Sequence, residues 1–197
     1  DLNRMHNHLH VDFDGQGAVD TITASREGLS LVRRDGDGWQ QLRLSAGRTG
    51  QADMNLNGAG EVRLGRLKSG RRFLVSVEPM HGDQLVVYQQ PEQPAEEWQR
   101  RVIHDGFRRG HALWTADFDG DGADEIAFGH SDTPEKFGVM VWWSDAGEGR
   151  EWRGQVVDVG GMATEDLTVA DFTGDGRPDI AAGGRATKNV RLYINQP

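Results

Sequence analysis

DFDGDGADE, at residues 117–125, is the stretch of this sequence that decides its fold. Two further copies of the pattern occur at residues 12–20 (DFDGQGAVD) and 171–179 (DFTGDGRPD). The copies start 105 and 54 residues apart, so a repeat of about half the longer spacing predicts another copy near residue 65. Residues 65–75 (GRLKSGRRFLV) keep a turn glycine and the apolar run that follows it, but they have lost every acidic position. Four repeats of about 53 residues therefore fill the chain.

Each repeat contains four short strand-forming segments separated by turn signals. In the third repeat these segments are 111–116, 126–129, 139–143 and 152–157, and the last one begins at a tryptophan. Trp39 and Trp98 start the equivalent segments of the first two repeats. A four-stranded antiparallel unit repeated at this period, without helical periodicity in between, is typical of a β-propeller. A two-sheet sandwich of the same hairpins is the alternative, but it does not explain a fixed period.

We therefore expect an all-β fold, a single β-propeller domain over residues 1–197 with four-stranded antiparallel blades. The blades are expected at approximately 1–46, 47–105, 106–158 and 159–197. The last blade is expected to be incomplete, because the sequence stops at Pro197 before a tryptophan-led fourth strand. Three explanations remain open: the chain is part of a larger propeller, it closes with a three-stranded blade, or it assembles with a second copy.

Composition and charge limit the partners. The 22 Lys and Arg residues against 31 Asp and Glu residues give a net charge of -9, which disfavours nucleic acid or an anionic membrane surface and favours a neutral or cationic partner. The absence of cysteine excludes a disulfide framework, a thiolate nucleophile and Cys-ligated zinc. No run approaches 18 apolar residues and the first residues lack an apolar leader segment, so we expect neither membrane insertion nor a leader in this chain.

Alternate positions of the acidic loops have the spacing of oxygen ligands to Ca²⁺, with glycine allowing the sharp turn. Carboxylates so close together repel one another without a cation, so we expect two or three structural calcium ions. Such sites fill where calcium is abundant, which favours an extracytoplasmic (secreted or periplasmic) location. The expected ligands are Asp12, Asp14, Gln16, the carbonyl of Ala18 and Asp20 in the first blade; Asp117, Asp119, Asp121, the carbonyl of Ala123 and Glu125 in the third; and Asp171, Thr173, Asp175, the carbonyl of Arg177 and Asp179 in the fourth.

A second group of polar residues is expected at the opposite end of the blades. The first strand of a blade lines the propeller axis and the second runs antiparallel to it, so residues before the first strand and after the second meet on one face. Counting back six residues from the first loop position gives His6, Ala59, His111 and Glu165, and counting forward thirteen to sixteen gives Glu78, His81, His130, Gly184 and Arg185. Asp166 adjoins this set, and His8 and His10 alternate on the side of His6.

Imidazole and carboxylate groups from separate strands suit Zn²⁺, Mn²⁺ or Fe²⁺ in an open catalytic site, and they equally suit metal-free acid–base catalysis. We expect His81 and His111 to be ligands of an axial transition metal, with Glu165 or His6 completing the set. Glu78 or His130 is expected to transfer protons. Arg185 is a further catalytic candidate. The opposing interpretation is that these side chains are merely solvated in a wet, polar channel.

The acidic loops resemble the calcium loops of FG-GAP or VCBS-type propeller repeats, the group that includes integrin α-subunit heads. A narrower resemblance, to a bacterial and fungal VCBS propeller group similar to the propeller of aldos-2-ulose dehydratase, implies metal-assisted loss of water from a keto-sugar. In that reaction a base removes the proton α to the carbonyl and the metal polarises the carbonyl. The narrower resemblance is carried by Glu78-Pro79-Met80-His81-Gly82, Gly110-His111-Ala112-Leu113-Trp114, Thr164-Glu165-Asp166-Leu167 and Gly183-Gly184-Arg185-Ala186-Thr187-Lys188-Asn189-Val190.

Two functions are compatible with these features. The first is a calcium-stabilised propeller that is, or forms part of, a metal-dependent carbon–oxygen lyase (a sugar dehydratase). The alternative is a non-catalytic extracellular module that binds a glycan or a protein through exposed aromatic residues such as Trp142, Trp143 and Trp152. In both, a carbohydrate or another small neutral molecule is the expected ligand. The sequence contains no Ser-His-Asp pattern, Walker loop or dinucleotide fingerprint.

Overall fold

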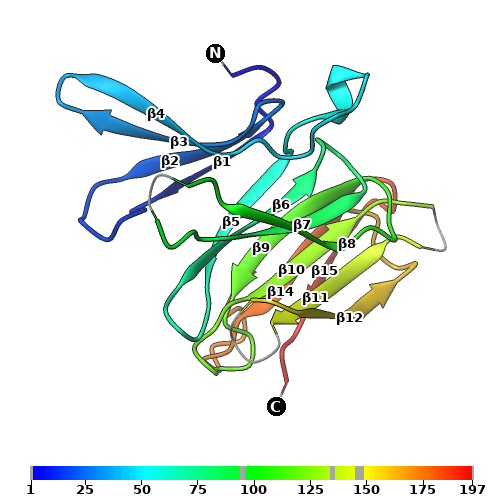
Figure 1. Ribbon diagram of the computed structural model, residues 1–197. Coiled ribbons are helices and arrows are strands. Elements are labelled where there is room, and N and C mark those ends of the chain that lie inside the picture. Colours follow the sequence, from blue (N-terminus) through cyan, green and yellow to red (C-terminus); the bar gives the residue numbers. More distant parts are fainter. Residues whose placement is uncertain (1, 94–95, 134–135, 145–148, 197) are drawn as a thin grey trace.

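The computed structural model describes residues 2–93, 96–133, 136–144 and 149–196. Within these residues the strands form four antiparallel sheets, each made of strands that are consecutive in the sequence (Figure 1). Blade 1 contains β1 (Asn7–Val11), β2 (Asp20–Ser25), β3 (Gly28–Asp35) and β4 (Gly38–Ser45). Blade 2 contains β5 (Glu61–Arg66), β6 (Arg72–Glu78), β7 (Gln84–Gln89) and β8 (Gln99–His104). Blade 3 contains β9 (Gly110–Ala116), β10 (Glu125–His130), β11 (Gly138–Ser144) and β12 (Trp152–Val159), and blade 4 contains β13 (Thr164–Ala170), β14 (Asp179–Gly184) and β15 (Asn189–Tyr193).

The blades follow one another around a common inner line. β1 contacts β5, β5 contacts β9, and β9 contacts β13, so the first strand of every blade lies on the inside. In each blade the second, third and fourth strands then lead outward in sequence order. This arrangement confirms the prediction of an all-β propeller, with three strands in the last blade. A short 3₁₀ helix, η1 (Met54–Leu56), lies in the connection between the first two blades.

The core lies between the blades. Three clusters of buried apolar side chains fill the interfaces of blades 1 and 2, blades 2 and 3, and blades 3 and 4. β6 and β10 are buried along nearly their whole length, because neighbouring blades cover both of their faces. A fully buried side chain such as Phe128 contributes about 1.5–3 kcal/mol by leaving water.

The outward faces of the first and last blades are not covered. In β1, Leu9 and Val11 pack on the first core cluster, whereas His8 and His10 on the other face are exposed. In β15, Val190 is 80% exposed and Leu192 is also exposed. The array is therefore an arc of blades with an open face at each end.

Blades 3 and 4 approach closely near the axis, and this approach requires a glycine. A Cβ atom on Gly129 would lie 2.4 Å from Cγ2 of Thr164, far inside van der Waals contact. Thr164 is itself buried, and its hydroxyl donates to the carbonyl of Gly138 at 3.0 Å. This packing fixes the start of β13, where the polar residues of the axial face begin.

The tryptophans expected to be exposed are largely covered. Trp142 is buried in the second core cluster, Trp152 packs edge-to-face on Phe73 at 5.1 Å between ring centroids, and Trp143 packs on the third cluster. Trp142 and Trp143 lie in β11, the third strand of blade 3, and Trp152 begins β12; contacts with neighbouring core side chains cover these rings. Among the described residues, no helix is long and apolar enough to cross a bilayer.

Candidate metal centre

One polar residue of each blade reaches the axial face from the same position of the inner strand. The residue five positions before the end of β1, β5, β9 and β13 is His6, Glu61, His111 and Glu165, respectively. Because the four strands run side by side, these four residues come to the same end of the propeller, opposite the acidic loops.

Three imidazoles from three different blades meet at this end. His6 belongs to blade 1, His81 follows β6 in blade 2, and His111 lies in β9 of blade 3. Their possible ligand nitrogens all lie within 4.8 Å of one another. Nε2 of His6 and Nε2 of His81 are 2.8 Å apart, and the rings of His81 and His111 stack with centroids 4.5 Å apart. Two nitrogens on one tetrahedral zinc ion stand about 3.3 Å apart, a separation close to the 2.8 Å between Nε2 of His6 and Nε2 of His81.

The carboxylate of Glu61 lies beside two of the three imidazoles, those of His6 and His111. Its Oε1 lies 2.8 Å from Nδ1 of His6 and 3.9 Å from Nδ1 of His111, and its side chain is buried. The hydrogen bond to Glu61 raises the pKa of His6 despite the opposing effect of burial. A carboxylate on Nδ1 leaves Nε2 free to face a metal, as is usual for metal-bound histidines.

His81 is held in the neutral form needed for ligation. Burial, followed by the proximity of His111 and His6, lowers the pKa of His81 to about 4. Its backbone adopts a φ of +53°, a left-handed conformation that costs a non-glycine residue about 1 kcal/mol.

Sequence reasoning missed Glu61 because the second loop is shorter than the others. Counting from Gly65 gave Ala59 as the axial residue of blade 2. In the structure β5 ends at Arg66, so the first loop position is Leu67 and the positive-φ glycine Gly70 occupies the fourth position, as the first glycine does in the acidic loops. Counting with Gly70 as the fourth loop position leads to Glu61. Ala59 is buried in the first core cluster and takes no part in the site.

Glu78 lies elsewhere. It is fully buried, forms an ion pair with Nη2 of Arg100 at 2.7 Å, and accepts a hydrogen bond from the hydroxyl of Tyr88. Burial raises the pKa of Glu78, while Arg100 and Tyr88 oppose this shift. The carboxylate therefore belongs to a polar network within blade 2, and its contacts give no support to a role in proton transfer at the axis.

His130 is also directed away from the three imidazoles. Its ring stacks on Phe128 at 5.6 Å and lies beside Phe107, at the interface of blades 2 and 3. Burial lowers the pKa of His130 to about 4. Its Nδ1 is buried without a hydrogen-bond partner among the described residues. His8 and His10 lie on the exposed face of β1 with ring centroids 5.0 Å apart.

Glu165 and Arg185 stand at the rim of the centre. Oε1 of Glu165 lies 4.0 Å from Nε2 of His111 and 3.5 Å from Nη1 of Arg185. The Glu165 side chain is 33% exposed and that of Arg185 is 78% exposed, so both are open to solvent. Asp166 is exposed and caps the N–H of Leu167. Gly184 is buried in β14.

The three acidic loops share one backbone turn. In each loop the first aspartate accepts the N–H groups of both glycines at 2.6–3.0 Å, and both glycines have φ values between +76° and +90°. No neighbouring atom lies within 4 Å of a Cβ placed on these glycines, so the backbone conformation rather than space requires them. The ninth-position acids Asp20, Glu125 and Asp179 are all buried.

In the first loop an arginine neutralises the expected calcium ligands. Nη2 of Arg33 lies 2.6 Å from Oδ2 of Asp20 and 3.1 Å from Oδ2 of Asp14. The guanidinium thus bridges two of the five groups expected to bind the ion, and a cation from the chain itself stabilises this turn. Gln16 only donates its N–H to the carboxylates of Asp12 and Asp14.

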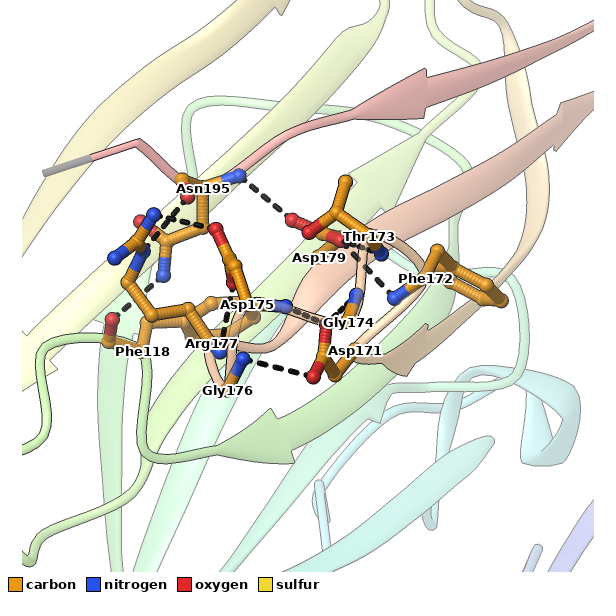
Figure 2. A network of polar contacts seen from close by, with 10 residues as sticks. All are labelled: Phe118, Asp171, Phe172, Thr173, Gly174, Asp175, Gly176, Arg177, Asp179 and Asn195. Atoms are coloured by element: carbon orange, nitrogen blue, oxygen red, sulfur yellow. Dashed lines mark hydrogen bonds and ion pairs between the residues drawn. The ribbon is translucent and has the colours of Figure 1, made fainter.

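In the fourth loop, backbone N–H groups donate hydrogen bonds to Asp179, the acid at the ninth loop position (Figure 2). Asp179 accepts from Phe172 at 3.1 Å, from Thr173 at 3.2 Å and from Asn195 at 2.8 Å. The side chain of Arg177, whose carbonyl was expected to be a ligand, folds back onto the carboxylate of Asp175. This loop therefore satisfies much of its own negative charge.

Within the described part of the chain, the third loop brings several carboxylates together without an arginine between them. Carboxylate oxygens of Asp117, Asp119 and Glu125 lie within 4.8 Å of one another. Burial and the repulsion of Asp119, Asp117 and Asp121 raise the pKa of Glu125 to about 7, although the N–H of Phe118 opposes the shift. Nζ of Lys68, from the shortened loop of blade 2, lies 3.3 Å from Asp121. Oxygen donors in this arrangement fit Ca²⁺ better here than in the other two loops.

Two family models and one known protein resemble parts or most of this chain. Residues 3–91, which contain His6, Glu61 and His81, match the family profile of the aldos-2-ulose dehydratase β-propeller domain, and residues 117–182 match the FG-GAP-like repeat. The chain is 27% identical over 204 residues to aldos-2-ulose dehydratase of Phanerodontia chrysosporium, covering 95% of this chain and 22% of that protein.

A solved structure has a similar fold at lower sequence identity. It is the structure of an Agrocybe aegerita lectin that recognises non-reducing terminal N-acetylglucosamine. The two folds superimpose with a TM-score of 0.56 at 18% sequence identity, and the match covers 96% of this chain and 49% of the lectin chain. The chain thus spans about a fifth of the curated relative and half of the lectin chain. The resemblance inferred from the motifs is confirmed: the chain is similar to the aldos-2-ulose dehydratase propeller in its first half and to FG-GAP-like repeats in its second.

Proposed function

We propose that this chain is a calcium-stabilised propeller whose axial centre binds a divalent transition metal and eliminates water from a sugar derivative, as a carbon–oxygen lyase or the propeller part of one. The observation that carries the proposal is the meeting of His6, His81 and His111, from three separate blades, with ligand atoms within 4.8 Å. Three histidines brought together from distant parts of the chain, with a buried carboxylate on one Nδ1, are typical of a catalytic zinc site.

The donor set fits a borderline metal ion with an open position. Nitrogen donors suit Zn²⁺ or Fe²⁺ rather than Ca²⁺ or Mg²⁺. A metal bound to His6, His81 and His111 would supply polarisation of the substrate carbonyl. Glu61 would hold the His6 ring in place, and Glu165, at the rim beside His111, leaves one side of the centre open to solvent.

Glu165 is the group best placed to move the proton. Its carboxylate is partly exposed and lies next to both His111 and Arg185. In the proposed elimination, Oε1 of Glu165 takes the proton α to the carbonyl, the carbon–oxygen bond at the β carbon breaks, and the same proton leaves with the hydroxyl as water. Nη1 of Arg185, 3.5 Å from Oε1 of Glu165, places a positive charge beside this carboxylate.

The choice of a sugar derivative rests on the similarity to aldos-2-ulose dehydratase over nearly the whole chain. The name of that protein indicates dehydration of a keto-sugar, and the first-half match includes three of the axial residues. The lectin of similar fold recognises N-acetylglucosamine, which is compatible with a carbohydrate ligand.

For the structural cation, we propose Ca²⁺ in the third loop, where Asp117, Asp119 and Glu125 converge. Calcium there would offset the repulsion that makes Glu125 costly to ionise. The fourth loop, with Asp171, Thr173 and Asp179, is the next candidate. A need for calcium favours a secreted or periplasmic location.

Metal analysis tests the proposal. The purified protein is dialysed with limiting Zn²⁺ and Ca²⁺, and the bound metals are measured per chain by mass spectrometry. We expect about one zinc ion in the native protein, none in the His81→Ala, His111→Ala double variant, and one in the matched His8→Ala, His10→Ala control, whose histidines are exposed and outside the centre. Calcium should be equal in all three proteins.

Turnover is then followed with D-glucosone, an aldos-2-ulose, and with a keto-sugar that carries a carboxylate or phosphate, by the appearance of an unsaturated ketone. Loss of turnover in the His81→Ala, His111→Ala variant, but not in the control, supports the lyase. Zinc binding without turnover of keto-sugars would contradict the reaction. Glycan binding that persists without the three histidines would instead favour the non-catalytic module, although the covered positions of Trp142 and Trp152 leave it less support.

A further inference from the structure

A cleft opens beside the axial centre, between blades 3 and 4. Its volume is about 720 Å³, enough for a monosaccharide derivative. Glu165 lines the cleft and also lies 4.0 Å from Nε2 of His111, so the cleft and the three imidazoles share a wall. A ligand in the cleft could therefore present one end to the metal centre while its other end lies farther along the cleft.

The cleft is rich in arginine. Arg108, Arg109 and Arg185 all line it, together with the acids Asp132 and Glu165. This local excess of positive charge contrasts with the net charge of -9 for the whole chain.

Two of these guanidinium groups are available to a ligand. Arg185 is within 3.5 Å of Glu165, but neither Arg108 nor Arg109 forms an ion pair within the part of the chain that the structure describes. The backbone at Arg109 has a φ of +54°, and its carbonyl accepts the N–H of Ser131 at 3.1 Å. This hydrogen bond ties the arginine segment to Ser131, which follows β10 and also lines the cleft.

We propose that this cleft binds the anionic group of an acidic sugar, with Arg108 and Arg109 holding a carboxylate or phosphate while the sugar ring extends toward the metal centre. The planar guanidinium forms paired hydrogen bonds to such anions. Ser131 and Thr133 also line the cleft and provide hydroxyls for the sugar. The inference deepens the proposed function by naming the substrate class, and it replaces the neutral ligand expected from net charge.

Isothermal titration calorimetry at low salt tests this inference with D-glucuronate, D-glucose 6-phosphate and D-glucose as probes. We expect at least one of the anionic sugars to bind roughly tenfold or more tightly than glucose. The tighter of the two anions identifies the group as carboxylate or phosphate. Equal affinity for all three sugars, or no binding of either anion, would overturn the inference.

Variants assign the preference to the cleft. Arg108→Gln combined with Arg109→Asn, which tolerates the left-handed backbone, should remove the preference. The matched control, Arg34→Gln with Arg101→Gln, alters two exposed arginines outside the cleft and should keep it. A preference unchanged in the first pair would contradict the assignment. Because the His81→Ala, His111→Ala variant should keep anion binding while losing zinc, failure of the cleft and failure of the metal centre give different results.

Discussion

Arg33 lies 2.6 Å from Asp20, at the position where the first acidic loop was expected to hold a calcium ion. The pair joins the third strand of blade 1 to the residue at which β2 begins, and Asp20 is buried. The same backbone turn is therefore stabilised in two ways in one molecule, by an internal guanidinium in blade 1 and, as we propose, by calcium in blade 3.

Replacing Arg33 with methionine should convert the first loop into a calcium-dependent one. With chelator present, we expect the free energy of unfolding to fall by about 1–3 kcal/mol, because Asp20 is left buried without its partner. Added calcium should restore part of this loss and raise the calcium bound per chain. Urea unfolding with and without calcium measures both effects. Arg34→Met, at the exposed neighbouring position, is the control, and equal calcium dependence in the two variants would count against the interpretation.

Glu125→Gln should have opposite effects in the absence and presence of calcium. Without calcium at pH 8, the amide removes a repelled, buried charge while its oxygen still accepts the N–H of Phe118, so stability should rise by about 1 kcal/mol. With calcium, a ligand is lost and stability should fall relative to the native protein. Asp179→Asn is the comparison, since it weakens hydrogen bonds from three backbone N–H groups and should destabilise under both conditions. Thermal denaturation reports each case.

Glu61→Gln should weaken the axial metal without removing a ligand. The amide no longer holds Nδ1 of His6 as a charged acceptor does, and loss of such a partner typically lowers metal affinity 10–100-fold. Competition with a zinc chelator measures the affinity. Glu151→Gln, at an exposed position, should leave it unchanged. Equal zinc affinity for Glu61→Gln and the native protein would show that Glu61 does not position the cluster.

Arg100→Met should destabilise the fold without affecting the metal. The substitution leaves the fully buried carboxylate of Glu78 without its ion-pair partner, a change that typically costs about 3–5 kcal/mol. The double variant Glu78→Leu, Arg100→Met should recover much of this loss, because no charge remains buried. Chemical denaturation and zinc content are the measurements. A double variant that folds and binds zinc but loses turnover would return Glu78 to the catalytic machinery.

Acidification should destabilise the protein partly through His130. In the folded state burial lowers the pKa of His130 to about 4, whereas an unfolded histidine takes up a proton near pH 6.5. Between these values the unfolded state binds more protons, so the free energy of unfolding should fall as the pH drops below about 6.5 and level off near 4. Urea unfolding at pH 7 and pH 5 tests this. His130→Phe should lose less stability over this interval than the native protein or a His8→Phe control.

The repeat spacing alone determined the propeller. Three copies of one loop in a common register gave the blade period, and the turn and strand signals between them gave four strands per blade. These features are local: a glycine with positive φ and an alternating or buried strand depend on residues close in sequence, so spacing reveals them. The same register was enough to place His6, His111 and Glu165 at one end of the inner strands.

Tertiary structure decided which charges meet. The shortened loop of blade 2 concealed the position of Glu61 in the sequence. Arg33, from the third strand of blade 1, takes the place expected for a calcium ion. Glu78 pairs with Arg100 within its own sheet instead of facing the axis. Each outcome depends on which face of a strand a side chain occupies and on what packs against it across a blade or an interface. Sequence spacing fixes the position of a residue along a strand, but the energy of a charge is set by its neighbours in space, and only the packed blades bring those neighbours together.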